Sequence, residues 1–311
     1  RSIYREQDLV PLQMVNPEAD FRVRVLEMPE ELVKETVQKE MLKPFDLEHD
    51  LMLRVTLIKV GENSHVLILV MHHIASDGWS MGVLVNEFTQ AYSAFVTGEK
   101  PELPALPIQY ADFATWQRKW LDEIAIAGQL EYWREKLEGL PPLLELPTDF
   151  PRPAVQTFNG DSCKFSFTPE LSASIRTFCR TNGYTPYMLI LAAFTVVLSK
   201  YSRQGDVAVG SPIANRTRTE LEPLIGFFVN TLVIRAEIDP EQTFLELVEQ
   251  VRESTLEASQ NQDIPFERLV DELNPERSLG HQPLFQVLFN MLNAPSGGAT
   301  ELPGLTLHPV E

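Results

Sequence analysis

The chain contains 311 residues, of which 44% are apolar, and it carries a formal net charge of −18. This length and composition allow a substantial core and suit two domains of ordinary size. The negative charge opposes binding to nucleic acids and to anionic membranes, and no cluster of lysine or arginine reverses it locally, so neither is an expected partner. No apolar run reaches the roughly 18 residues that span a bilayer and no signal-peptide pattern is present, which favours a soluble, cytoplasmic protein.

The first part of the chain shows strand and helix patterns in turn. Residues 21–26 alternate between polar and apolar side chains, as in a strand with one wet face, and residues 29–42 have the pattern of an amphipathic helix. Residues 51–60 and 65–71 are two predicted strands, and the turn-forming residues 61–64 between them predict a hairpin. This hairpin would deliver the chain to a turn that carries two histidines.

The turn reads His72-His73-Ile74-Ala75-Ser76-Asp77-Gly78-Trp79 and connects the apolar strand to a predicted helix. Ser80 is predicted to cap this helix, whose apolar residues recur at helical spacing until Gly98 ends it. Adjacent residues on a strand point to opposite faces, so if the strand continued through both histidines, His72 and His73 could not serve one site. One would then be a working base and the other a packing residue.

Prolines mark the middle of the chain. A helical stretch is predicted over residues 109–137, with a candidate break at Gly128. The proline-rich residues 139–153 suit an extended crossover between two lobes better than the interior of a helix or strand. We therefore expect an N-terminal lobe, crossover included, over residues 1–150 and a C-terminal lobe over residues 151–311.

The second half has its own series of elements. Predicted strands cover residues 162–167, 207–210, 227–238, 284–292 and 305–307, and predicted helices cover residues 169–180, 186–201 and 244–258. Mixed helices and strands in both halves predict two α/β sandwich lobes. Cys163 and Cys179 lack the spacing of metal ligands and are expected in the core, so no metal site is predicted.

The pattern His-His-x-x-x-Asp has three interpretations from spacing alone. A metal site is disfavoured, because neighbouring histidines on a strand diverge and no third ligand cluster accompanies them. Core histidines beside an N-capping aspartate are a purely structural alternative. The third is a general base: a neutral imidazole can accept a proton from a nucleophile, and the amides of the following helix can stabilise an oxyanion. Acyl transfer needs both groups, and the serine-hydrolase turn Gly-x-Ser-x-Gly is absent from the sequence.

The histidine turn resembles the signature motif of the condensation domains of nonribosomal peptide synthetases. Four later segments resemble further motifs of that family in the same order, namely residues 110–116, 225–232, 261–267 and 277–285. The last of these departs from the common Arg-Asp-x-Ser-Arg form. The family's first motif is absent, and residues 1–4 resemble the tail of its second, so the resemblance leads us to expect a chain truncated at both ends.

The resemblance implies an α/β fold of two chloramphenicol acetyltransferase-like sandwich lobes in a V-shape with a central tunnel. It implies donor and acceptor peptidyl carrier proteins at opposite mouths of the tunnel, each presenting a thioester on a 4′-phosphopantetheine arm, and a neighbouring adenylation domain. The acceptor's amine would attack the donor's thioester carbonyl and form an amide bond. The domain itself would bind no cofactor.

By the same resemblance, His73 lies beside the reacting amine, either as a base or as a positioning and electrostatic group. Gly78 would let the backbone approach the reacting carbonyl closely. His72 is expected to be structural. Asp77 is expected to face away from the tunnel and to pair with an arginine, for which Arg1 is the nearest match in the motifs.

Other residues near these motifs are weaker candidates. Trp79, Ser80 and Asn230 are expected to line the tunnel. Arg216 and Arg218 lie in a loop that could hold a pantetheine arm or a carrier phosphate, although a solvated loop would have the same sequence.

Relatives with the same histidine motif supply the functional alternatives. Epimerisation domains share it, but residues 226–231 resemble the condensing branch, and heterocyclisation domains replace the histidine pair with an aspartate. Residues 278–281 lean toward the branch that joins an L-configured donor to an L-configured acceptor. A non-catalytic docking module of the same fold is the alternative from another class, and the intact His73, Asp77 and Gly78 weigh against it.

Overall fold

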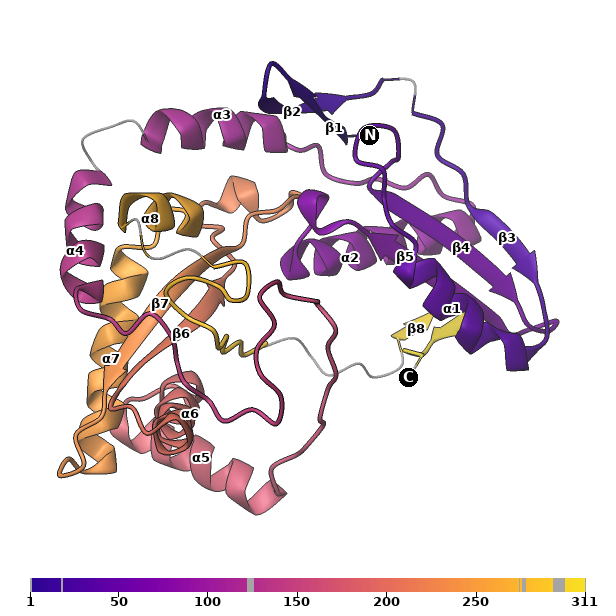
Figure 1. Ribbon diagram of the computed structural model, residues 1–311. Helices are drawn as coiled ribbons and strands as arrows, with labels where there is room; N and C mark the ends of the chain where they lie inside the picture. The colour runs from indigo at the N-terminus through magenta and orange to yellow at the C-terminus, as the bar shows by residue number, and fades with distance from the viewer. Residues whose placement is uncertain are drawn as a thin grey trace. The chain divides into compact units, whose positions relative to one another are not determined.

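The computed structural model describes residues 2–17, 19–121, 126–273, 275, 278–292 and 300–310. The chain divides into two compact units of mixed helices and strands (Figure 1). The first contains Arg1–Trp116, Arg216–Phe228 and Ala299–Glu311, and the second contains Gln117–Asn215 and Val229–Gly298. The chain therefore leaves the first unit near residue 116 and returns to it twice.

The predicted boundary at residue 150 differs from this division. The proline-rich stretch that suggested it packs on the second unit instead of running free between lobes. Leu144 is buried in the core of that unit, and its N–H donates to Gln286 Oε1 at 2.7 Å. The carbonyl of Leu143 accepts from Gln204 Nε2 at 3.0 Å.

The first unit contains two hairpins and a three-stranded sheet of order β3-β4-β5. Its strands are β1 (Ser2–Gln7), β2 (Val10–Val15), β3 (Arg24–Glu27), β4 (Leu53–Lys59), β5 (His65–Met71), β8 (Thr300–Leu302) and β9 (Leu305–Leu307). Its helices are η1 (Glu30–Leu32), α1 (Val33–Leu42), η2 (His73–Ala75), α2 (Gly78–Thr97) and η4 (Thr219–Leu221), and α3 (Tyr110–Leu121) starts in it. Helix α1 packs on the sheet, where Val33 joins Ile58 and Ile68 in a small core.

The predicted hairpin before the histidine turn is confirmed. Strands β4 and β5 pair antiparallel from Leu53 opposite Met71 to Lys59 opposite His65. Strand β3 pairs parallel to β4 on its other side. Helix α2 ends as predicted at Gly98, whose φ of 80° lies in the left-handed region that favours glycine.

The second unit is organised around the antiparallel pair β6 (Asp206–Ile213) and β7 (Asn230–Glu237). Its helices are α4 (Ala127–Leu137), α5 (Pro169–Asn182), α6 (Pro186–Ser202), α7 (Phe244–Gln260) and α8 (Phe266–Leu273). Helices α6 and α7 pack against each other and against the strand pair. Helices α5 and α6 both begin with proline at the first helical turn behind a capping threonine, as the sequence predicts for α5.

Two predicted strands of the second half are wrong. Residues 162–167 form no strand, and Phe165 is 81% exposed, because no neighbouring segment among the described residues pairs with their backbone. Residues 284–292 make a single parallel bridge, between Gly210 and Leu288. Leu284 has a φ of 67°, which is incompatible with a regular strand at that position.

The break predicted at Gly128 is also wrong, since Gly128 lies inside α4. Cys179 is buried as expected, but Cys163 is exposed. No single helix among the described residues is long and apolar enough to cross a membrane. Helices α5 and α6 meet that criterion only as a pair, with a bend of 111° between them.

Candidate active site

The histidine turn is shaped by backbone hydrogen bonds at the end of β5. The strand ends at Met71, and His72 caps the short helix η2, with its Nδ1 accepting from the Ile74 N–H at 3.0 Å. The His72 ring meets Phe45 edge-on, with ring centroids 5.7 Å apart. The strand therefore does not continue through both histidines, but these contacts still give His72 a structural position.

His73 is exposed, and its ring has one nitrogen engaged. Nδ1 lies 2.6 Å from the carbonyl oxygen of Ser76. Because a carbonyl can only accept, a neutral His73 must carry its proton on Nδ1, which leaves a lone pair on Nε2. Within the described part of the chain, Nε2 makes no hydrogen bond. The imidazole thus presents one free basic nitrogen.

Asp77 caps α2 and pairs with Arg216, which lies 139 residues further along the chain. Arg216 Nη2 is 3.1 Å from Asp77 Oδ1, and the two side chains are 1% and 0% exposed. Arg216 Nη1 also donates to the carbonyls of Leu221 and Leu224. Arg1, the partner expected from the motifs, lies outside the described residues.

This burial corrects the role expected for Arg216. A guanidinium that is 1% exposed and bonded to a carboxylate and two carbonyls cannot reach a pantetheine arm or a phosphate. Arg218, in the same loop, lies over the ring of Trp116, with Cζ 5.1 Å from its centroid. Both arginines thus have partners inside the first unit.

Ser80 completes the buried network, which corrects two expectations about it. Asp77, and not Ser80, is the N-cap of α2, with Oδ1 accepting from the Ser80 N–H at 2.8 Å. Ser80 is fully buried instead of lining a tunnel. Its hydroxyl lies 2.7 Å from Asp77 Oδ1 and 2.9 Å from the carbonyl of Gly226. It also accepts from the Gly226 N–H at 3.1 Å and from Arg216 Nη2 at 3.0 Å.

The electrostatics of Asp77 follow from these contacts. Burial by itself would raise the pKa of its carboxyl. Hydrogen bonds from Ser80 and from the Phe228 N–H, together with the charge of Arg216, outweigh burial and hold the pKa of Asp77 below its ordinary value. Asp77 is therefore a permanently ionised brace and cannot exchange protons near neutral pH.

A segment of the second half of the chain carries the aromatic wall of the site. Phe227 meets His73 with ring centroids 5.2 Å apart and ring planes at 88°. The hydroxyl of Tyr110 donates to the carbonyl of Phe227 at 2.8 Å. Beside it Gly226 is required, because a Cβ there would lie 2.3 Å from the Tyr110 ring. The sequence predicted residues 225–232 only as a motif and did not identify Phe227 as a neighbour of His73.

Gly78 and Trp79 lie at the exposed start of α2. A Cβ on Gly78 would meet no atom within 4 Å, so neither packing nor a positive φ demands glycine at this position. Trp79 is 47% exposed, and its Nε1 donates to the carbonyl of Glu222 at 2.9 Å. Both residues border the open side of the turn.

Asn230 lies in the second unit, and its amide is engaged there. Its Nδ2 donates to the carbonyls of Gln262 at 2.9 Å and Ile264 at 2.8 Å. Its Oδ1 accepts from the Phe266 N–H at 3.0 Å and from the Thr231 N–H at 2.9 Å. The side chain thus fixes the start of α8 and has no hydrogen-bonding group left for a substrate.

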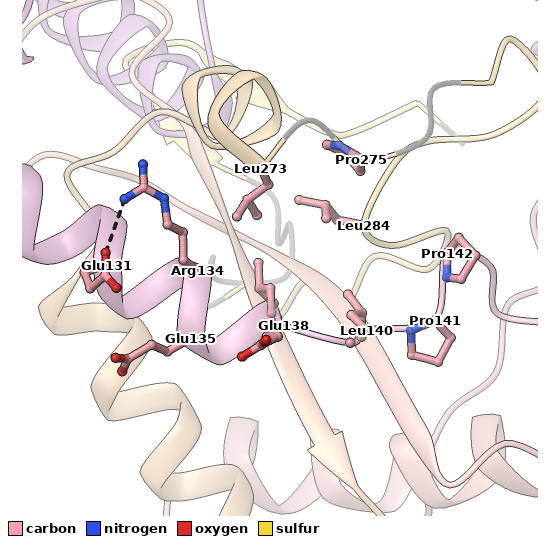
Figure 2. A pocket seen from close by; sticks show the side chains of 12 residues that line it. Glu131, Arg134, Glu135, Glu138, Leu140, Pro141, Pro142, Leu273, Pro275 and Leu284 are labelled. Carbon is pink, nitrogen blue, oxygen red and sulfur yellow. Dashed lines mark hydrogen bonds and ion pairs between the residues drawn. The ribbon is translucent and has the colours of Figure 1, made fainter.

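A cavity of about 520 Å³ in the second unit differs in chemistry from the histidine turn (Figure 2). Glutamates and apolar residues of α4 and the following loop line it, and Arg134 pairs there with Glu131 at 3.2 Å. Its lining has no histidine, cysteine or hydroxyl group, so it offers no nucleophile and no neutral base. Across residues that the structure describes, no group of three potential metal ligands occurs.

Comparison with known proteins adds three findings. The family model described as Condensation domain matches residues 1–302. A linear gramicidin synthase of Brevibacillus parabrevis is 46% identical over 302 residues, which are 95% of this chain and 6% of that protein. Malpinin synthetase of Mortierella alpina is 44% identical over 279 residues, which are 90% of this chain and 4% of that protein. The chain therefore spans a small part of the length of these relatives.

Two solved structures share the fold. The X-domain from teicoplanin biosynthesis, solved in complex with OxyB, superposes with a TM-score of 0.85 and 29% identity, covering 93% of this chain and 64% of that one. A four-domain nonribosomal peptide synthetase bound to AMP and glycine superposes with a TM-score of 0.81 and 25% identity, covering 94% of this chain and 22% of that one. Together they support the predicted α/β fold of chloramphenicol acetyltransferase-like lobes.

Proposed function

This chain belongs to the condensation-domain family of nonribosomal peptide synthetases, and on that premise we propose that it joins a donor thioester to the amine of an acceptor aminoacyl thioester. The donor is an acyl or peptidyl group. Each substrate arrives on the 4′-phosphopantetheine arm of a peptidyl carrier protein, and the domain itself holds no cofactor. An adenylation domain that loads the acceptor carrier is the expected neighbour, in the cytoplasm.

The observation that carries the proposal is the free Nε2 of His73. Its Nδ1–H is held by the Ser76 carbonyl at 2.6 Å, so a lone pair is available at an exposed position. The neutral acceptor amine attacks the thioester carbonyl, and Nε2 takes one proton from the amine as the C–N bond forms. When the C–S bond breaks, the same proton passes to the leaving thiolate, which gives an amide and a free thiol.

Gly78 contributes space to this step. Because a Cβ there would meet nothing within 4 Å, the absence of a side chain serves something outside the protein's own packing. The exposed amides at the start of α2 are suited to a developing oxyanion when the carbonyl approaches closely. Asp77, which is buried beside Arg216, stays out of the chemistry and holds the turn.

The test is amide formation between a loaded donor carrier and a loaded acceptor carrier. We expect His73→Ala to remain folded and lose most of the product, and His73→Gln, which keeps an amide but no basic nitrogen, to lose a similar amount. If His73→Gln kept wild-type activity, base catalysis would be wrong and a positioning role would replace it. A product with inverted configuration and no new amide would indicate an epimerisation-type reaction.

The second candidate is a partner-docking module, which the similarity to the X-domain solved in complex with OxyB favours. The same assay separates the two functions. If loaded carriers yield no amide with the wild-type protein in its native multidomain chain, docking is supported. Amide that depends on His73 rules docking out as the main function.

A further inference from the structure

We propose that Phe227 is a positioning residue for His73, whose ring holds the imidazole so that Nε2 points at the acceptor amine. The reference to the amine rests on the proposed function. The ring contact does not: the centroids lie 5.2 Å apart at an interplanar angle of 88°.

The backbone on both sides of Phe227 is fastened to the start of α2. The N–H of Gly226 donates to Ser80 Oγ at 3.1 Å. The N–H of Phe228 donates to Asp77 Oδ2 at 3.0 Å. Both acceptors are buried and are themselves bonded to each other, so residues 226 and 228 are held by a single rigid network. Phe227 lies between two fixed points.

A third contact holds Phe227 itself. Its carbonyl accepts from the Tyr110 hydroxyl at 2.8 Å. The Tyr110 ring also packs against the ring of Phe228, which is 2% exposed, with centroids 5.1 Å apart. Phe228 is thus anchored in a core, whereas Phe227 is 39% exposed and faces the histidine. Three consecutive residues are fixed, and the side chain that this arrangement presents is the one against His73.

The imidazole needs this second restraint. The bond from Nδ1 to the Ser76 carbonyl comes from the same turn, three residues away, and fixes one atom of the ring. Rotation about the last side-chain torsion of histidine has broad minima, so one hydrogen bond leaves the plane of the ring loosely defined. An edge-to-face aromatic contact of this geometry favours one orientation by a factor of about 2 to 12. Phe227 therefore sets the ring plane, and Ser76 sets the tautomer.

The experiment compares Phe227→Leu with a matched control, Phe88→Leu. Phe88 lies in the same unit, is 38% exposed and stacks on Tyr92 with ring centroids 6.4 Å apart. Nitrogen-15 NMR of histidine-labelled protein reports the tautomer of His73, assigned by its loss in His73→Ala. We expect one Nδ1–H tautomer with a protected Nδ1 proton in the wild type and in Phe88→Leu, and a broadened, mixed signal in Phe227→Leu.

Amide formation is the second readout. Phe227→Leu should lower kcat by about 2- to 12-fold with little change in the KM for the acceptor carrier, and Phe227→Tyr, which keeps the ring, should restore both readouts. A wild-type tautomer signal in Phe227→Leu, an unchanged kcat, or equal losses in Phe88→Leu would each overturn the proposal. If the wild type formed no amide, the proposed function would fail, and the NMR comparison would still decide whether Phe227 positions His73.

Discussion

Removal of the Asp77 carboxylate should unfold the first unit before it affects any chemical step. Asp77→Ala leaves the guanidinium of Arg216, which is 1% exposed, without its counter-ion and leaves the N–H groups of Ser80 and Phe228 without acceptors. Breaking a buried ion pair from one side costs about 3–5 kcal/mol. Because whole domains are stable by only about 5–15 kcal/mol, this loss removes a large fraction of the total.

Thermal and urea unfolding followed by circular dichroism measure the effect. At about 2–4 °C per kcal/mol for a domain of this size, the expected fall in melting temperature is about 6–20 °C. Glu35→Ala is the control: its ion pair with Lys39 also lies in the first unit, but the two side chains are 61% and 72% exposed. That exposed pair contributes at most about 1 kcal/mol.

A double mutant separates the charge from the packing. Asp77→Ala with Arg216→Met removes both charges, so the loss should be smaller than the sum of the two single losses by about 0.5–3 kcal/mol. If Asp77→Ala melted like the wild type and yet formed no amide, the carboxylate would take part in the reaction. The purely structural role of Asp77 would then be refuted.

Three further outcomes are expected. The lowered pKa of Asp77 means that its contribution to stability is complete above the ordinary carboxyl value of 3.8 and is lost as the pH falls through the lower value of the folded state. Acid unfolding of Asp77→Asn should therefore lack that pH-dependent step. Ser80→Ala should cost about 1–3 kcal/mol in urea unfolding, because the buried Gly226 N–H loses its acceptor. Gly78→Ala should leave the melting temperature unchanged or slightly raised, since its Cβ meets nothing within 4 Å, while amide formation falls; an unchanged rate would contradict the close approach of substrate.

Local signals in the sequence predicted local structure well. The capping glycine at residue 98, the proline at the start of α5 and the turn residues between β4 and β5 each act over a few residues, so their outcome depends little on the rest of the fold. The predicted strand at residues 162–167 failed for the opposite reason. An alternating pattern shows what a strand could bury, but a strand forms only where another backbone supplies hydrogen bonds.

The contacts that complete the site could not be predicted from spacing. Asp77 was expected to pair with an arginine, and Arg216 was singled out from the sequence, but for binding phosphate and not for this pair. Nothing local distinguishes an exposed arginine from one that is buried 139 residues away from its partner. Ser80 was misplaced similarly, because a serine three residues after an N-cap looks the same whether it faces solvent or the Gly226 backbone.

The return of residues 216–228 to the first unit sets an order of events during synthesis. The Phe228 N–H that bonds Asp77 lies 151 residues after it. At about 5–20 residues per second, a ribosome needs about 8–30 seconds to make that interval. Throughout it, a carboxylate destined for complete burial has no partner and stays in water. The histidine turn therefore reaches working geometry only after most of the second unit has been made, and residues 1–116 expressed alone would lack Arg216 and Phe227.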